Sequence, residues 1–144
     1  MCLSSVQDAE RKPDETGECW KVVLTDPDRP EIFHSPFACE QTPFGEWAVA
    51  KEEPVKRLEY VVYTSGFHVF ASEPDAKEFL ENYIPAFQAY RTSHGRRNLR
   101  IVKGKYKGVI CRGTIFVEDR DPQTLDHFIP VIVVQHQMME RPAA

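Results

Sequence analysis

The sequence predicts an α+β fold: a single domain in which a mainly antiparallel sheet of about six strands packs against one long or proline-kinked helix. Two short apolar runs, Tyr60–Tyr63 and Phe67–Phe70, are separated by a turn-forming Thr-Ser-Gly segment and predict a strand pair. An apolar stripe at helical spacing follows from Ala76 to Tyr90. Further apolar runs, which would supply the sheet that this helix covers, lie at residues 19–24, 108–117 and 128–134.

The first third of the chain contains one clear strand. Residues 1–17 are polar and include helix- and strand-breaking residues, which indicates a flexible N-terminal arm or an extension at the edge of the sheet. Cys19–Leu24 is a compact apolar run and predicts a strand. Residues 31–45 are aromatic but interrupted by two prolines and a glycine, so we expect a structured loop there. Glu46–Lys51 fits either a short strand or a single helical turn.

The predicted helix begins at Ser72. Asp75 follows three residues later in a capping-box-like pattern, and Pro74 is tolerated in the first turn because its missing N–H would be unpaired there anyway. The apolar stripe consists of Ala76, Phe79, Leu80, Tyr83, Phe87 and Tyr90. Pro85 lies inside this pattern and removes a backbone donor, so we expect the helix to kink or split near Tyr83.

The last third is expected to form strands. Leu99–Tyr106 and Gly108–Val117 would pair across a bend at the glycine, and Phe128–Val134 is apolar enough to be buried on both faces. The predicted organisation is therefore an arm over residues 1–17, one domain over 18–140 and a frayed tail over 141–144. The length of 144 residues suits a single domain of this kind.

Composition excludes several classes of protein. The net charge is −4, with 18 basic and 22 acidic residues interspersed, so nucleic-acid binding is not expected. No apolar run approaches the roughly 20 residues of a membrane span, and the N-terminus lacks the basic and apolar regions of a secretion signal. We therefore expect a cytoplasmic protein that does not enter a membrane.

Cysteine and histidine spacing gives no metal motif. The cysteines are scattered, with no C-x-x-C pair and no H-x-x-x-H pair nearby, so we expect no metal site and no disulfide framework. His68 alternates with Phe67 and Val69 in a predicted strand and therefore faces away from them, toward a cleft or solvent. His68 is the first candidate for a functional side chain.

An aromatic contact surface is a second candidate. Exposed aromatic residues commonly anchor binding interfaces. The residues that could form such a surface or bind a ligand are Phe33, His34, Phe37, Phe44, Trp47 and His68. The alternative is that these residues simply cover the sheet face that the helix does not reach.

Two resemblances bear on function. The Met1-Cys2-Leu3 start, Trp20–Val23, Ser35-Pro36-Phe37 and the Gly-Phe-His-x-Phe segment at 66–70 together resemble a group of small, uncharacterised bacterial and bacteriophage proteins. The segment from Gly66 to Ala76 also looks like the strand and helix portion of ADP-ribosyltransferase-like folds. The first likeness implies no established activity.

The transferase likeness implies a basic residue on the first strand, a central serine or tyrosine, and a glutamate motif near the last strand. The first strand offers Trp20 and Lys21. The late counterpart is the Gln-His-Gln run ending at Gln137, which lacks the glutamate that binds the ribose hydroxyl. The resemblance therefore implies either an altered enzyme or a degenerate relative that still binds NAD or another nucleotide.

Three hypotheses follow. The first is a non-enzymatic binding protein of phage or mobile-element origin, without a cofactor, that acts through a protein or small nucleotide partner. The second is an ADP-ribosyltransferase-like enzyme in which Ser35, His68 and Gln137 converge on a cleft. The third is a hydrolase whose nucleophile is Cys2, exposed as the N-terminal residue once Met1 is removed. The sequence leaves open whether the chain is an enzyme and favours a non-enzymatic role, because no compact catalytic motif is present.

Overall fold

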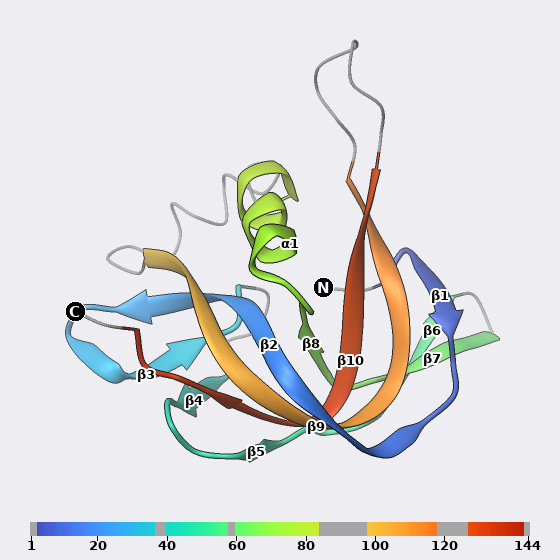
Figure 1. The fold of residues 1–144 in the computed structure, drawn as a ribbon, viewed down its shortest axis with the longest axis horizontal. Coiled ribbons are helices and arrows are strands. Elements are labelled where there is room, and N and C mark those ends of the chain that lie inside the picture. Colours follow the sequence, from blue (N-terminus) through green and yellow to red (C-terminus); the bar gives the residue numbers. More distant parts are fainter. Residues whose placement is uncertain (1–2, 37–39, 58–59, 84–97, 118–126, 143–144) are drawn as a thin grey trace, which may run out of the picture.

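Three long antiparallel strands lie side by side at the centre of the fold (Figure 1). The structure, a computed structural model, describes residues 3–36, 40–57, 60–83, 98–117 and 127–142. Strand β9 (Asn98–Val117) is in the middle. Strand β2 (Lys12–Asp26) pairs with one edge of β9, and β10 (His127–Met139) pairs with the other.

Shorter strands extend this sheet on both sides, in the order β4-β3-β2-β9-β10-β5. The added strands are β3 (Arg29–His34), β4 (Gln41–Pro43) and β5 (Ala48–Val49). Strand β1 (Ser5–Asp8) pairs with the C-terminal half of β9. It passes so close to Gly113 that a Cβ atom there would collide with the backbone of Ser5, which explains the glycine inside the β9 strand.

Strand β8 (Phe67–Val69) closes the sheet into a near-barrel. It pairs with β10, where Val69 lies opposite Ile132. The next residue, Phe70, exchanges two backbone hydrogen bonds of 2.8 Å with Trp20 of β2. Strand β8 therefore bridges β10 and β2, so that β2, β9, β10 and β8 form a ring with few free edges.

Two clusters of buried apolar side chains pack against opposite faces of the sheet. Strand β10 contributes to both because consecutive strand residues point to opposite faces. Val131 and Val133 pack in one cluster, and Ile132 and Val134 pack in the other. The prediction that the run Phe128–Val134 is buried on both faces is confirmed from Val131 to Val134 and is wrong at its start, where Phe128 is 57% exposed.

A short helix covers one opening of the near-barrel (Figure 1). Helix α1 (Glu73–Glu78) continues into a π-helical turn, η1 (Phe79–Tyr83). The predicted N-cap is confirmed, because the Ser72 hydroxyl accepts a hydrogen bond from the Asp75 N–H at 3.3 Å. The ring of Phe79 is buried and lies 5.2 Å from that of Phe70, which anchors the helix to the end of β8.

The predicted α+β class is wrong. Most of the described residues lie in antiparallel strands, and the structure contains one short helix rather than a sheet packed on a long one. The predicted continuation of the helix to Tyr90, with its kink at Pro85, lies outside the described residues. The physical reason for the error is that half-exposed strands carry too few apolar residues to show a strand pattern, so the sheet was underestimated.

The predicted strand pair at residues 60–70 is also corrected. Strand β7 (Tyr60–Ser65) pairs with β6 (Glu53–Arg57) in a separate two-stranded sheet, whereas β8 pairs with β10. The two strands are therefore consecutive but do not form a hairpin. Gly66 separates them at a place where a Cβ atom would lie 2.6 Å from the carbonyl oxygen of Val134.

The segment that we interpreted as an arm, residues 1–17, contains β1 and the first part of β2, both paired with β9. The helices in the described ranges are too short or too polar for any of them to cross a membrane.

Candidate functional site

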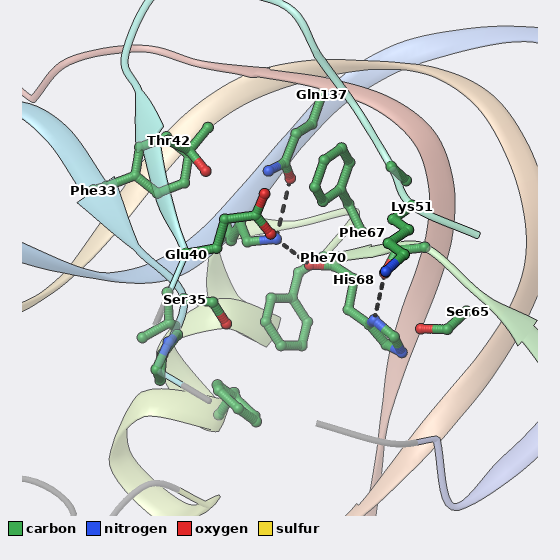
Figure 2. A pocket seen from close by; sticks show the side chains of 16 residues that line it. Phe33, Ser35, Glu40, Thr42, Lys51, Ser65, Phe67, His68, Phe70 and Gln137 are labelled. Carbon is green, nitrogen blue, oxygen red and sulfur yellow. Dashed lines mark hydrogen bonds between the residues drawn. The ribbon is translucent and has the colours of Figure 1, made fainter. Parts of the chain in front are cut away.

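A cavity of about 250 Å³ lies beside the closing strand β8, between β2, β3, β10 and the helix (Figure 2). Its volume is that of roughly eight water molecules at about 30 Å³ each. The lining residues are Lys21, Val22, Phe33, Ser35, Pro36, Glu40, Thr42, Ala50, Lys51, Ser65, Gly66, Phe67, His68, Phe70, Phe79 and Gln137. Aromatic rings and hydroxyl groups therefore face the same cavity, a combination typical of small-molecule sites.

Lys21 is the most unusual residue of this wall. It lies on β2 between the buried residues Cys19 and Val23, and only 8% of its surface is exposed. Its Nζ donates hydrogen bonds to the backbone oxygen of His68 at 3.2 Å and to Oε1 of Gln137 at 3.1 Å. Burial lowers the pKa of the Lys21 amine to about 8.

The partners of the Lys21 ammonium are all neutral. In addition to the two oxygens, the ammonium lies 5.4 Å from the centre of the Phe67 ring, in a cation–π contact. No carboxylate among the described residues forms an ion pair with it. Lysine is rarely buried without an opposite charge, so this wall holds a positive charge that no described residue neutralises in an ion pair.

His68 is held by hydrogen bonds at both ring nitrogens. The Gly66 carbonyl, 3.2 Å from Nδ1, can only accept, so Nδ1 carries the proton. Nε2 is then free to accept from the Tyr63 hydroxyl at 3.3 Å, and that hydroxyl accepts from the Leu3 N–H at 3.1 Å. Burial and the nearby Lys21 charge lower the pKa of His68 to about 3. The ring is therefore neutral near pH 7, and its basic nitrogen is already engaged.

Three of the predicted catalytic candidates meet at the cavity. Ser35 follows β3, His68 lies on β8 and Gln137 lies on β10, and all three line the same space (Figure 2). Gln137 is 2% exposed, and its amide oxygen is engaged by Lys21. The fourth candidate, Cys2, lies outside the described residues.

The predicted aromatic contact surface is distributed differently. Phe33 is buried, lines the cavity, and lies 4.8 Å from the ring of Phe44. His34 is buried as well, and Phe37 lies outside the described residues. Trp47 is 53% exposed. These side chains therefore do not share one exposed face: some belong to the core and cavity, and Trp47 faces solvent.

Lys21 is a candidate site residue that the sequence singled out only through the comparison with the transferase motif. The available signal is its place inside the apolar run Cys19–Leu24, where a lone charge alternates with buried residues. Within the described residues, no group of three or more His, Cys, Asp and Glu side chains is placed to bind a metal ion.

The exposed charged residues of the cavity lining are of both signs. Glu40 and Lys51 line the cavity and are exposed, and Lys51 also forms an ion pair with Glu53 at 3.1 Å. Exposed charges of this kind are screened by solvent, whereas the Lys21 ammonium is buried. Comparisons with protein-family models, with curated proteins and with solved structures each found no match for this chain.

Proposed function

We propose that this chain is a non-enzymatic binding protein whose ligand is a small organic anion with an aromatic or other apolar body. One observation carries the proposal: among the described residues, the hydrogen-bond partners of a buried lysine ammonium on the cavity wall are all neutral. A carboxylate on a ligand would supply the missing opposite charge.

The energetics favour an anionic ligand. A buried charge without an opposite partner is costly because it has lost its hydration, and two neutral oxygens replace only part of it. A bound carboxylate would accept the remaining Lys21 hydrogen bond and form an ion pair in a place shielded from water. The hydroxyl groups of Ser35, Thr42 and Ser65 line the same space and could donate to further ligand oxygens.

The walls favour an apolar ligand body of limited size. The rings of Phe33, Phe67 and Phe70 surround the cavity (Figure 2). Aromatic rings pack against each other in offset or edge-to-face contact, which suits a ligand with a single ring. A volume of about 250 Å³ suits a ligand body with a single ring.

Isothermal titration calorimetry with benzoate tests this proposal, with benzamide as the uncharged probe of similar shape. We expect benzoate to bind more tightly than benzamide to the unmodified chain, and the preference to disappear in Lys21→Met. Lys105→Met is the matched control, because Lys105 is an exposed lysine on the neighbouring strand β9 and does not line the cavity. Equal affinity for both probes in the unmodified chain would show that Lys21 does not select anions.

An ADP-ribosyltransferase-like protein is the second candidate. The observation in its favour is that Ser35, His68 and Gln137 line one cavity. Against catalysis, the basic nitrogen of His68 is engaged by Tyr63, and the Gln137 amide oxygen is engaged by Lys21. Titration with NAD in the calorimeter, with a separate assay for free nicotinamide, distinguishes the transferase from the anion-binding protein. Saturable NAD binding together with release of nicotinamide would support the transferase. No NAD binding and no nicotinamide release would rule the transferase out.

A further inference from the structure

We propose that Lys21 also forms a covalent imine with a small aromatic aldehyde or ketone that enters the cavity. This goes beyond reversible anion binding, although it rests on the proposed function in one respect, because the same cavity must admit a one-ring ligand. The proposal assigns the Lys21 Nζ as a nucleophile and names carbonyl compounds as a second ligand class.

The first support is the geometry around Nζ. A lysine nitrogen has four tetrahedral positions, one of which is its own carbon chain. Two more are occupied by the hydrogen bonds donated to the His68 carbonyl and to Gln137 Oε1. Both acceptors are neutral, and a neutral amine keeps two N–H groups that can still donate to them, although more weakly than an ammonium does. Only the fourth position changes on deprotonation, from a third N–H to a lone pair.

The second support is the pattern of charges around the amine. The titratable groups around the Lys21 amine are Cys19 on the same strand, the neutral His68 ring, and the exposed Glu40 and Lys51 of the cavity lining. None of these forms an ion pair that would hold the proton on Lys21. Burial is therefore the main cause of the Lys21 pKa shift and lowers that pKa to about 8, from an ordinary value of 10.5. At pH 7 that shift increases the fraction of neutral amine about 300-fold.

The reaction needs no other reagent. The Nζ lone pair attacks the carbonyl carbon, a C–N bond forms, and the carbonyl oxygen takes up a proton to give a carbinolamine. Loss of that oxygen as water, together with the remaining N–H proton, leaves a C=N bond between Lys21 and the ligand. Lysine amines desolvated in apolar pockets are known to be activated for this step. The aromatic walls would hold the ring of the carbonyl compound close to Nζ.

The experiment traps the imine. The full chain is incubated at pH 7 with benzaldehyde and sodium cyanoborohydride, which reduces an imine to a stable benzylamine, and the labelled lysines are located by peptide mass spectrometry. We expect Lys21 to be labelled at least tenfold faster than the exposed Lys105, despite its burial. Lys21→Arg keeps the positive charge but cannot form the imine, so the fast phase should be absent in this variant and retained in Lys105→Met.

Benzoate titration of the same sample separates this inference from the proposed function. Benzoate binding without preferential labelling of Lys21 would overturn the imine and leave anion binding intact. Preferential labelling without benzoate binding would support the imine and remove the anion-binding function. Equal labelling of all lysines, with no benzoate binding, would overturn both. Addition of benzoate should also slow the labelling of Lys21, because both ligands need the same space.

Discussion

Replacing Lys21 with methionine should change the pH dependence of folding stability by an amount set by its burial. Lys21 is 8% exposed, and its pKa is about 8 in the folded chain against an ordinary value of 10.5. Each pH unit of that difference corresponds to about 1.4 kcal/mol. The ammonium therefore destabilises the folded chain by about 3 kcal/mol at pH 7, relative to a pH at which the amine is neutral in both states.

The direction of the change in stability with pH follows from which state of the chain keeps the Lys21 proton. Between pH 8 and 10.5 the unfolded chain keeps the Lys21 proton while the folded chain loses it, so stability rises with pH through this range. Burial also raises the pKa values of Cys19 and Tyr106 to about 12, and these groups act in the opposite direction above pH 9. Both groups are present in both chains, so the effect of their burial cancels in the comparison with Lys21→Met, and what remains is the lysine together with its smaller interaction with Cys19.

Urea unfolding at pH 7, 8, 9 and 10.5 measures the effect. The difference in unfolding free energy between the original chain and Lys21→Met should shift by about 3 kcal/mol toward the original chain as the pH rises. Lys105→Met, in which an exposed lysine is replaced, should show no such shift. A difference that stays constant within about 1 kcal/mol would refute the reasoning, because it would mean that the Lys21 ammonium is not desolvated.

Three further predictions concern the neighbours of the cavity. Tyr63→Phe should lower the unfolding free energy by roughly 1–3 kcal/mol in urea, because the Leu3 N–H and His68 Nε2 each lose a partner; an unchanged midpoint would contradict the hydrogen-bond chain. Gly66→Ala should cost roughly 1–3 kcal/mol because its Cβ would lie 2.6 Å from the Val134 carbonyl oxygen; full stability would show that the strands separate easily there. The His68 ring signals in NMR should not titrate between pH 5 and 8. The unfolding free energy should fall as the pH drops from 6.5 toward 3, because the unfolded chain takes up the His68 proton first. An NMR titration midpoint near pH 6.5 would rule out the buried neutral ring.

The strands with continuous apolar runs could be predicted from the sequence, and those with polar faces could not. Cys19–Leu24 lies within β2, and Phe128–Val134 lies within β10. Strand β2, however, begins at Lys12, because its first half pairs with β9 through the backbone while its side chains are mostly exposed. Backbone pairing leaves no periodic apolar signal when neither face is buried, so the segment has the composition of a loop.

Local signals marked where the chain bends but not which strands pair. Leu99–Tyr106 and Gly108–Val117 were expected to pair with each other, yet they form one strand, β9. Gly108 adopts a φ of +78°, a conformation open to glycine, and the strand continues through it. The partners of β9 come from residues far away in sequence, β2 and β10, and short-range composition carries no information about such contacts.

The cavity was only partly foreseeable for the same reason. Ser35, His68 and Gln137 were proposed to converge, and they do line one space, but the sequence gives no distance between residues on three separate strands. Lys21 could be recognised only as a lone charge in an apolar run. Its neutral partners come from β8 and β10, so their meeting depends on the closure of the near-barrel by the Trp20–Phe70 hydrogen bonds.

That closure connects the fold to the proposed chemistry. The strand pairing that seals β2 to β8 also brings the His68 carbonyl to the Lys21 Nζ, so the lysine cannot move to solvent without losing a partner. The buried ammonium destabilises the ligand-free folded chain by about 3 kcal/mol. A ligand that relieves this cost therefore gains up to that amount of binding free energy. An anion removes it by pairing with the charge, and a carbonyl compound removes it by converting the amine to an imine. Both classes of ligand should raise the stability of the folded chain in proportion to their binding, whereas a neutral ligand such as benzamide should not gain this contribution.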